Sequence, residues 1–232
     1  MLLVALVLCL AVLALITYLH FDDHVHAYQL LDDSTSWAGV KWYTGFLSHV
    51  VVLLWCASAA LCGFATTALR GSDDAELRGL CRFLSVMAVV NIWLTLDDLF
   101  LFHEQTARLL VGRSSQHEIE GVIFGLYALS LAAIFWWHRT VIARMDYPLL
   151  GMAIVSLLAS AAVDVAFQLE MDGANIFRET VLSVSWGPTV TDITEEVLKL
   201  NGAVLWLSFF FLGGFAGVRQ LVAGSQTGQT LC

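Results

Sequence analysis

The stretch TLDDLFLFHE, residues 95–104, places two adjacent aspartates, a histidine and a glutamate at the end of an apolar segment. Carboxylate and imidazole groups bind divalent transition metals, and inside membranes they also carry protons. An aspartate near the centre of a bilayer costs about 2.5–3.5 kcal/mol on insertion scales. We therefore expect Asp97 and Asp98 to be protonated, paired with a cation or bound to a metal ion.

Helical geometry, at about 100° per residue, predicts which polar side chains share a face. Asp97, Asp98 and Glu104 fall in one arc with Asn91, whereas His103 is expected to point elsewhere. Polar residues recur near the matching ends of other apolar segments: His117 and Glu120, then Ser156, Ser160 and Asp164, and finally Glu195, Glu196 and Lys199.

These residues define a predicted metal site, because helical bundles hold transition metals with carboxylates and imidazoles from facing helices. The predicted ligands are Asp97, Asp98, Glu104, His117, Asp164, Glu195 and Glu196, with Lys199 as a charge partner. The expected ion is a divalent transition metal, whose bound water could attack a lipid-like or small substrate. No HExxH motif is present, so the pattern predicts binding more strongly than catalysis.

Other interpretations stay open. Glu195 and Lys199 are spaced to form an ion pair on one helix, which would be structural. The acids could also relay protons or cations in a coupled transporter. However, the half of the predicted bundle that lies farther from these acids has few ionisable residues. A third possibility is a subunit of a larger membrane complex or a homo-oligomer. The Gly121/Gly125 and Gly213/Gly217 spacings suit close contact between helices in lipid.

Composition defines the elements that must position these groups. The chain has 232 residues, of which 59% are hydrophobic and 13% charged, and its mean hydropathy is +0.78. Soluble domains carry about 25% charged residues, so the chain is predicted to be a polytopic membrane protein in the lipid bilayer. No basic patch indicates nucleic-acid binding. The five cysteines show no paired spacing and are expected to pack as small apolar residues.

The predicted fold is all-α, with about six transmembrane helices in one bundle and one domain over 1–232. A spanning helix needs about 20 apolar residues. Windows of that kind fall at 2–20, 43–69, 80–103, 119–144, 147–170 and 194–222.

Basic residues near the spans predict the orientation. With six helices, one side of the membrane receives Arg70, Arg78, Arg82, Arg139, Arg144 and Arg219, mostly in short loops. This places both termini in the cytoplasm of a cell-membrane protein. Most carboxylates then lie at or near the outer side, so the polar site is expected to open outward.

Overall fold

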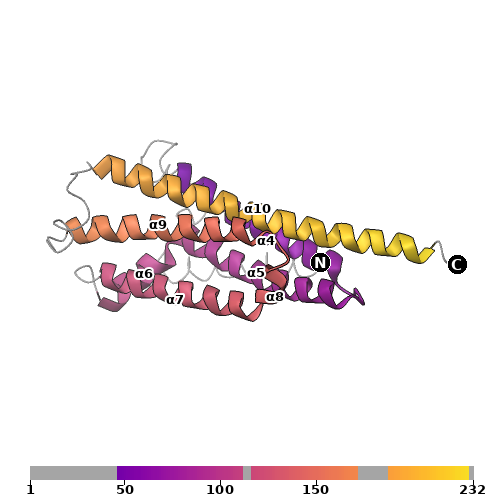
Figure 1. Ribbon diagram of the computed structural model, residues 1–232. Coiled ribbons are helices and arrows are strands. Elements are labelled where there is room, and N and C mark those ends of the chain that lie inside the picture. Colours follow the sequence, from indigo (N-terminus) through magenta and orange to yellow (C-terminus); the bar gives the residue numbers. More distant parts are fainter. Residues whose placement is uncertain (1–45, 112–115, 172–187, 230–232) are drawn as a thin grey trace, which may run out of the picture. The chain divides into compact units, whose positions relative to one another are not determined.

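The computed structural model describes residues 46–111, 116–171 and 188–229, apart from some side chains near the ends of these ranges (Figure 1). From Leu47 onward the chain forms one compact unit. Every regular element of the described residues is a helix, which confirms the all-α fold for that part of the chain. The predicted span 2–20 lies outside the described residues, and the single domain over 1–232 stays a prediction.

Within the described residues, four helices are long and apolar enough to cross a membrane: α4 (Phe46–Leu69), α5 (Ala75–Phe100), α7 (Gln116–Trp137) and α10 (Pro188–Gln229). A fifth helix, α9 (Tyr147–Met171), contains a shorter apolar stretch over Tyr147–Val163. Several apolar helices of spanning length are what the composition predicts for a multi-pass membrane protein. The number six is not established by these helices and stays a prediction.

Two predicted helices are each divided in the structure. The segment predicted as 80–103 is α5 followed by α6 (Phe102–Val111), which occupies a region expected to be a loop. Leu101, between them, has the left-handed φ of 51°, which ends α5. The segment predicted as 119–144 is α7 followed by the single turn α8 (Arg139–Ile142), with a break at His138.

Local sequence explains the starts of three helices. Gly71 has a φ of +89°, which suits glycine and turns the chain between α4 and α5. Asp74 then caps α5 by accepting a hydrogen bond from the Glu76 N–H at 2.7 Å. Pro148 stands in the first turn of α9 and Pro188 begins α10, where no backbone N–H is needed.

The core is an aromatic cluster inside the bundle. Trp206, Phe209 and Phe210 of α10 are almost fully buried. Phe209 and Phe210 contact the fully buried Phe83 of α5, and Trp206 packs against Phe210. Trp55 of α4 packs edge-on against Trp206, with ring centroids 5.8 Å apart. In lipid such contacts contribute through dispersion and shape, because hydrocarbon tails remove most of the hydrophobic driving force.

Helices α9 and α10 run side by side and share the most extensive contact in the described part of the chain (Figure 1). Gly202 of α10 lies directly against Leu157 of α9, where a Cβ atom would collide. The Ser156 and Ser160 hydroxyls of α9 donate to the backbone carbonyls of Leu198 and Glu195, each at 3.0 Å. This polar stripe of α9 therefore fixes α10 next to it.

Candidate functional site

The break at Leu101 organises the end of α5. The Leu101 N–H donates to the Asp97 carbonyl, and α6 begins at the next residue, Phe102. A left-handed conformation costs a non-glycine residue about 1–2 kcal/mol, so other contacts must stabilise it. The Asp97 carboxylate provides one of them, because its Oδ1 accepts the His103 N–H of α6 at 3.0 Å.

Asp97 is the centre of a buried hydrogen-bonded group. Its Oδ2 lies 2.9 Å from His103 Nδ1, and its Oδ1 also accepts from the Tyr127 hydroxyl of α7 at 3.2 Å. The Phe124 ring lies 4.9 Å from the His103 ring, centroid to centroid. A carboxylate in this position fixes the orientation and tautomer of an imidazole. The group therefore joins α5, α6 and α7 and holds His103 in one direction.

Asp98 points to different partners from Asp97. The Lys199 ammonium of α10 donates to Asp98 Oδ1 at 2.7 Å, and the two side chains are 27% and 12% exposed. Lys199 also lies within the electrostatic reach of Glu196 and Glu195. The Ser48 hydroxyl of α4 donates to Glu196 Oε1 at 3.0 Å. Asp98, Lys199, Glu196 and Ser48 therefore form one group, here called the lysine cluster, between α4, α5 and α10.

The lysine cluster contains two carboxylate oxygens without a partner. Asp98 Oδ2 and Glu196 Oε2 are buried and accept no hydrogen bond within the described part of the chain. A buried carboxylate oxygen normally accepts at least one hydrogen bond, and an unsatisfied one costs free energy. One ammonium also cannot balance two ionised carboxylates. The cluster can therefore take up a further positive charge.

Polar contacts continue one layer inward at Asn91 and Trp206. Trp206 Nε1 donates to Asn91 Oδ1 at 2.8 Å, and the Asn91 amide donates to the Met87 carbonyl, also at 2.8 Å. Below Asn91, the fully buried Phe83 and Phe209 pack edge to face. Within the described residues, the buried polar network is thus closed on one side by aromatic rings.

The structure brings together part of the predicted metal set. Asp98 and Glu196 meet around Lys199, while Asp97 turns to His103 and Tyr127. The side chains of Glu104, His117 and Asp164 lie outside the description, so their places in the set stay predictions. Among the residues that the structure describes, no three His, Cys, Asp or Glu side chains are grouped so as to hold a metal ion.

Sequence reasoning missed three members of these groups. His103 was expected to point elsewhere, but the break at Leu101 turns it back toward Asp97. Tyr127 and Ser48 were not placed in the site, and they provide the hydroxyls that bind Asp97 and Glu196. Only Tyr127 had a usable signal, since it follows Glu120 by seven residues and therefore lies on the same helical face.

Comparisons with known proteins give a family. Neither the curated proteins nor the solved structures contain a significant match to this chain. A family model described as a domain of unknown function, DUF8692, matches residues 1–212, which is most of the chain. The chain therefore belongs to the DUF8692 family.

Proposed function

We propose that this protein is a multi-pass membrane protein that binds a cation at the lysine cluster. The observation that carries the proposal is the pair of buried, unpartnered oxygens, Asp98 Oδ2 and Glu196 Oε2, beside a single lysine. Two ionised carboxylates and one ammonium leave an excess negative charge, and Glu195 adds to the field at Lys199. In a low dielectric such an excess is neutralised by a proton or by a bound cation.

A proton is the occupant that this geometry favours. Binding a proton requires only one or two carboxylate oxygens, and Asp98 and Glu196 each present one. A divalent ion needs more ligands and would be repelled by the Lys199 ammonium, which lies 2.7 Å from Asp98 Oδ1. The protein would then respond to the pH of the compartment that its polar end faces.

The second candidate for the bound cation is a divalent transition metal, which the carboxylates and imidazoles of the predicted set would suit. The contact between Asp97 and His103 supports it, because histidines that bind metals usually donate their other ring N–H to a carboxylate. Such a site would use His103 with ligands from the predicted set, including Glu104, His117 and Asp164. It could support metal-dependent chemistry on a lipid-like or small substrate.

The inner boundary of the network argues against a continuous transport path. The contact between Asn91 and Trp206 adjoins a layer that contains the fully buried Phe83 and Phe209. A proton-coupled transporter needs polar groups or water on both sides of its site. We therefore propose a site that loads and unloads from one side.

For the topology we propose six helices, with both termini in the cytoplasm of a cell-membrane protein. The lysine cluster then lies near the outer leaflet. Single-cysteine variants at positions 74 and 173, labelled in whole cells with an impermeant reagent, test this orientation. Labelling of position 173 but not of position 74 is expected, and the reverse pattern would invert the topology.

The cation proposal is tested by unfolding the purified protein between about pH 5 and about pH 9. If a proton is the bound cation, raising the pH removes it and leaves two carboxylates beside one ammonium, so stability falls as pH rises. Asp98→Asn removes one carboxylate charge and keeps an acceptor for Lys199, so it should flatten this dependence. Asp73→Asn is the matched control, because Asp73 is exposed and outside the cluster.

The same measurement separates the two occupants. Added zinc or manganese should leave the wild-type melting temperature unchanged if a proton is bound. A metal-dependent rise that chelator reverses, and that Asp98→Asn abolishes, would support the metal site instead. A wild type that responds to neither pH nor metal would contradict cation binding altogether.

A further inference from the structure

A second region, at the other ends of α5 and α10 from the lysine cluster, contains a cavity. It has a volume of about 560 Å³ and lies between the start of α5, the α8–α9 turn and the C-terminal half of α10. This volume is within the range of ligand sites, about 300–1,000 Å³. The region is called the arginine-end pocket below, after Arg144, which lines it.

The arginine-end pocket is apolar inside and polar at its rim. Leu77 is buried, and Leu80 and Met145 are half-buried, so these side chains form the inner wall. Glu76, Arg144 and Asp146 are exposed and surround the opening. A pocket with an apolar interior and charged rim suits an amphiphile, whose chain and headgroup need opposite environments.

Two glycines of α10 give the inner wall its shape. The Met145 side chain lies over Gly213 and the Leu80 side chain lies over Gly217, in each case where a Cβ atom would collide. Both glycines are buried and line the pocket. The wall is thus built from specific close contacts.

The pocket lies where apolar helices end. Ala75, the first residue of the apolar stretch of α5, lines it, and the apolar stretch of α7 ends at Trp137, shortly before the lining residues of α8. Trp136 and Trp137 are 71% and 81% exposed, and the Arg139 guanidinium lies 4.8 Å from the Trp136 ring. Exposed tryptophans and arginines at helix ends mark the headgroup level of a membrane.

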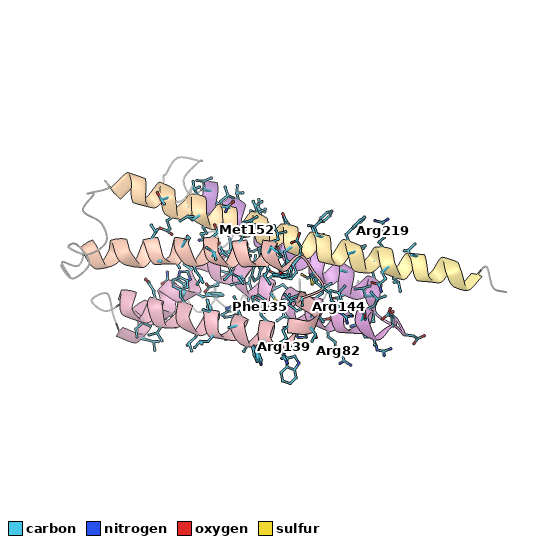
Figure 2. All side chains as sticks on the ribbon, viewed as in Figure 1. Arg82, Phe135, Arg139, Arg144, Met152 and Arg219 are labelled. Carbon is cyan, nitrogen blue, oxygen red and sulfur yellow. The ribbon has the colours of Figure 1, made fainter. Side chains whose placement is uncertain are left out.

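Figure 2 supports this placement, because Arg82, Arg139, Arg144 and Arg219 all lie in the same half of the unit. Anionic or zwitterionic headgroups are the phosphate sources nearest to such arginines in a membrane.

We propose that the arginine-end pocket binds one phospholipid with a phosphoethanolamine headgroup. The Arg144 guanidinium binds the phosphate, and the first part of the acyl chains lies against Leu80 and Met145. Arg144 now pairs with Glu76 on the surface, where both side chains are more than half exposed. Exposed ion pairs are weak, so phosphate can replace the Glu76 carboxylate as the partner of Arg144.

The charge of the rim selects the headgroup. One arginine and two acids, Glu76 and Asp146, leave the rim negative, which disfavours a lipid that carries only negative charge. Asp146 has no ion-pair partner among the described residues and can accept hydrogen bonds from an ammonium group. A trimethylammonium group has no N–H donor, so ethanolamine is preferred over choline.

Lipid binding to the delipidated full-length protein in detergent tests the proposal. Native mass spectrometry should detect one bound phosphatidylethanolamine, with affinity about tenfold above that for phosphatidylcholine or phosphatidylglycerol, or about 1.4 kcal/mol. Free phosphoethanolamine should bind far more weakly, because it cannot use the apolar wall. Equal binding of the three lipids, preference for phosphatidylglycerol, or tight binding of free phosphoethanolamine would each overturn the proposal.

Variants locate the lipid. Ala216 lines the pocket and is exposed, so Ala216→Leu should fill the space without changing the core, and it should abolish the selective binding. Ala132→Leu, on an exposed position of α7, is the matched control and should bind as the wild type does. Asp146→Asn should remove the preference for ethanolamine over choline. Unchanged binding in both Ala216→Leu and Asp146→Asn would place the lipid elsewhere and overturn the proposal.

Discussion

The lysine cluster and the arginine-end pocket each contain an ion pair between a basic residue and a carboxylate, but in opposite settings. Lys199 and Asp98 are 27% and 12% exposed, whereas Arg144 and Glu76 are 63% and 58% exposed. A buried pair cannot exchange its partner for water, and losing one member leaves an uncompensated charge. The exposed pair exchanges partners at little cost. The first arrangement suits a fixed site with a defined charge, and the second suits a reversible contact with a headgroup.

The largest effect is expected from Lys199→Met. This change leaves the Asp98 and Glu196 carboxylates without their cation. Breaking a fully buried pair costs about 3–5 kcal/mol, which is the upper limit for this half-buried pair. Denaturant unfolding in detergent measures the loss. The double variant Lys199→Met/Asp98→Asn should recover part of it, because the unpaired charge is then gone. If Lys199→Met lowered the free energy of unfolding as little as Arg144→Gln does, the two ion pairs would not differ in their contribution to stability.

A smaller effect is expected from Gly202→Ala, beside the lysine cluster. The new Cβ would lie 2.6 Å from Leu157 Cγ and 3.2 Å from the Leu157 backbone nitrogen, so α9 and α10 must separate slightly. We expect a loss of about 1–3 kcal/mol. The matched change Gly125→Ala meets no atom within 4 Å and should be neutral or slightly stabilising. Equal losses of stability from Gly202→Ala and Gly125→Ala would show that the close contact between Gly202 and Leu157 does not cause the loss.

Tyr127→Phe should cost about 1 kcal/mol, since it removes one hydrogen bond to the buried Asp97. Tyr147→Phe at the opposite end is the control, because Tyr147 is 62% exposed and its loss should not be measurable. Thermal unfolding of both variants under one detergent condition gives the comparison. A similar melting temperature for Tyr127→Phe and Tyr147→Phe would mean that the hydrogen bond from the Tyr127 hydroxyl to Asp97 does not contribute to stability.

The smallest effect on stability is expected from Arg144→Gln, at or below about 0.5 kcal/mol, because both partners of the ion pair are exposed. Raising the salt concentration should produce a similarly small change, since the pair is already screened by solvent. The same variant should nevertheless lose selective phospholipid binding. A large loss of stability would show that Arg144 has a structural role that its exposure does not suggest.

The chemistry of the polar end could be predicted from residue types, but its partners could not. Acids inside an apolar chain require compensation, and Lys199 was named as the charge partner because it lies on the same helical face as Glu195 and Glu196. Adjacent residues of a helix differ in direction by about 100°, however, so Asp97 and Asp98 contact different helices. The acids that were predicted to share one arc of the helix therefore lie in two separate groups in the structure.

The break at Leu101 could not be predicted, because leucine normally favours a helix and rarely adopts a positive φ. No glycine or proline marks the position. The break depends on the Asp97 carboxylate, which accepts the His103 N–H, and on the Tyr127 hydroxyl from another helix. Such contacts form only when three helices are already together, so neither local propensity nor hydropathy contains them.

The length of α10 has a consequence for the thickness of the surrounding bilayer. The candidate span Thr194–Gly224 has 31 residues, which at about 1.5 Å per residue extend over about 46 Å, and it carries Glu196, Lys199 and Arg219 toward its two ends. The hydrocarbon core of a typical bilayer is about 30 Å thick. An upright α10 would therefore place these charged residues near the two headgroup levels, and a bilayer of another thickness requires the helix to tilt or the bilayer to adjust locally. Because α9 is attached to α10 along its length, the two helices must tilt together, and bilayers of different thickness will favour different tilts of the pair.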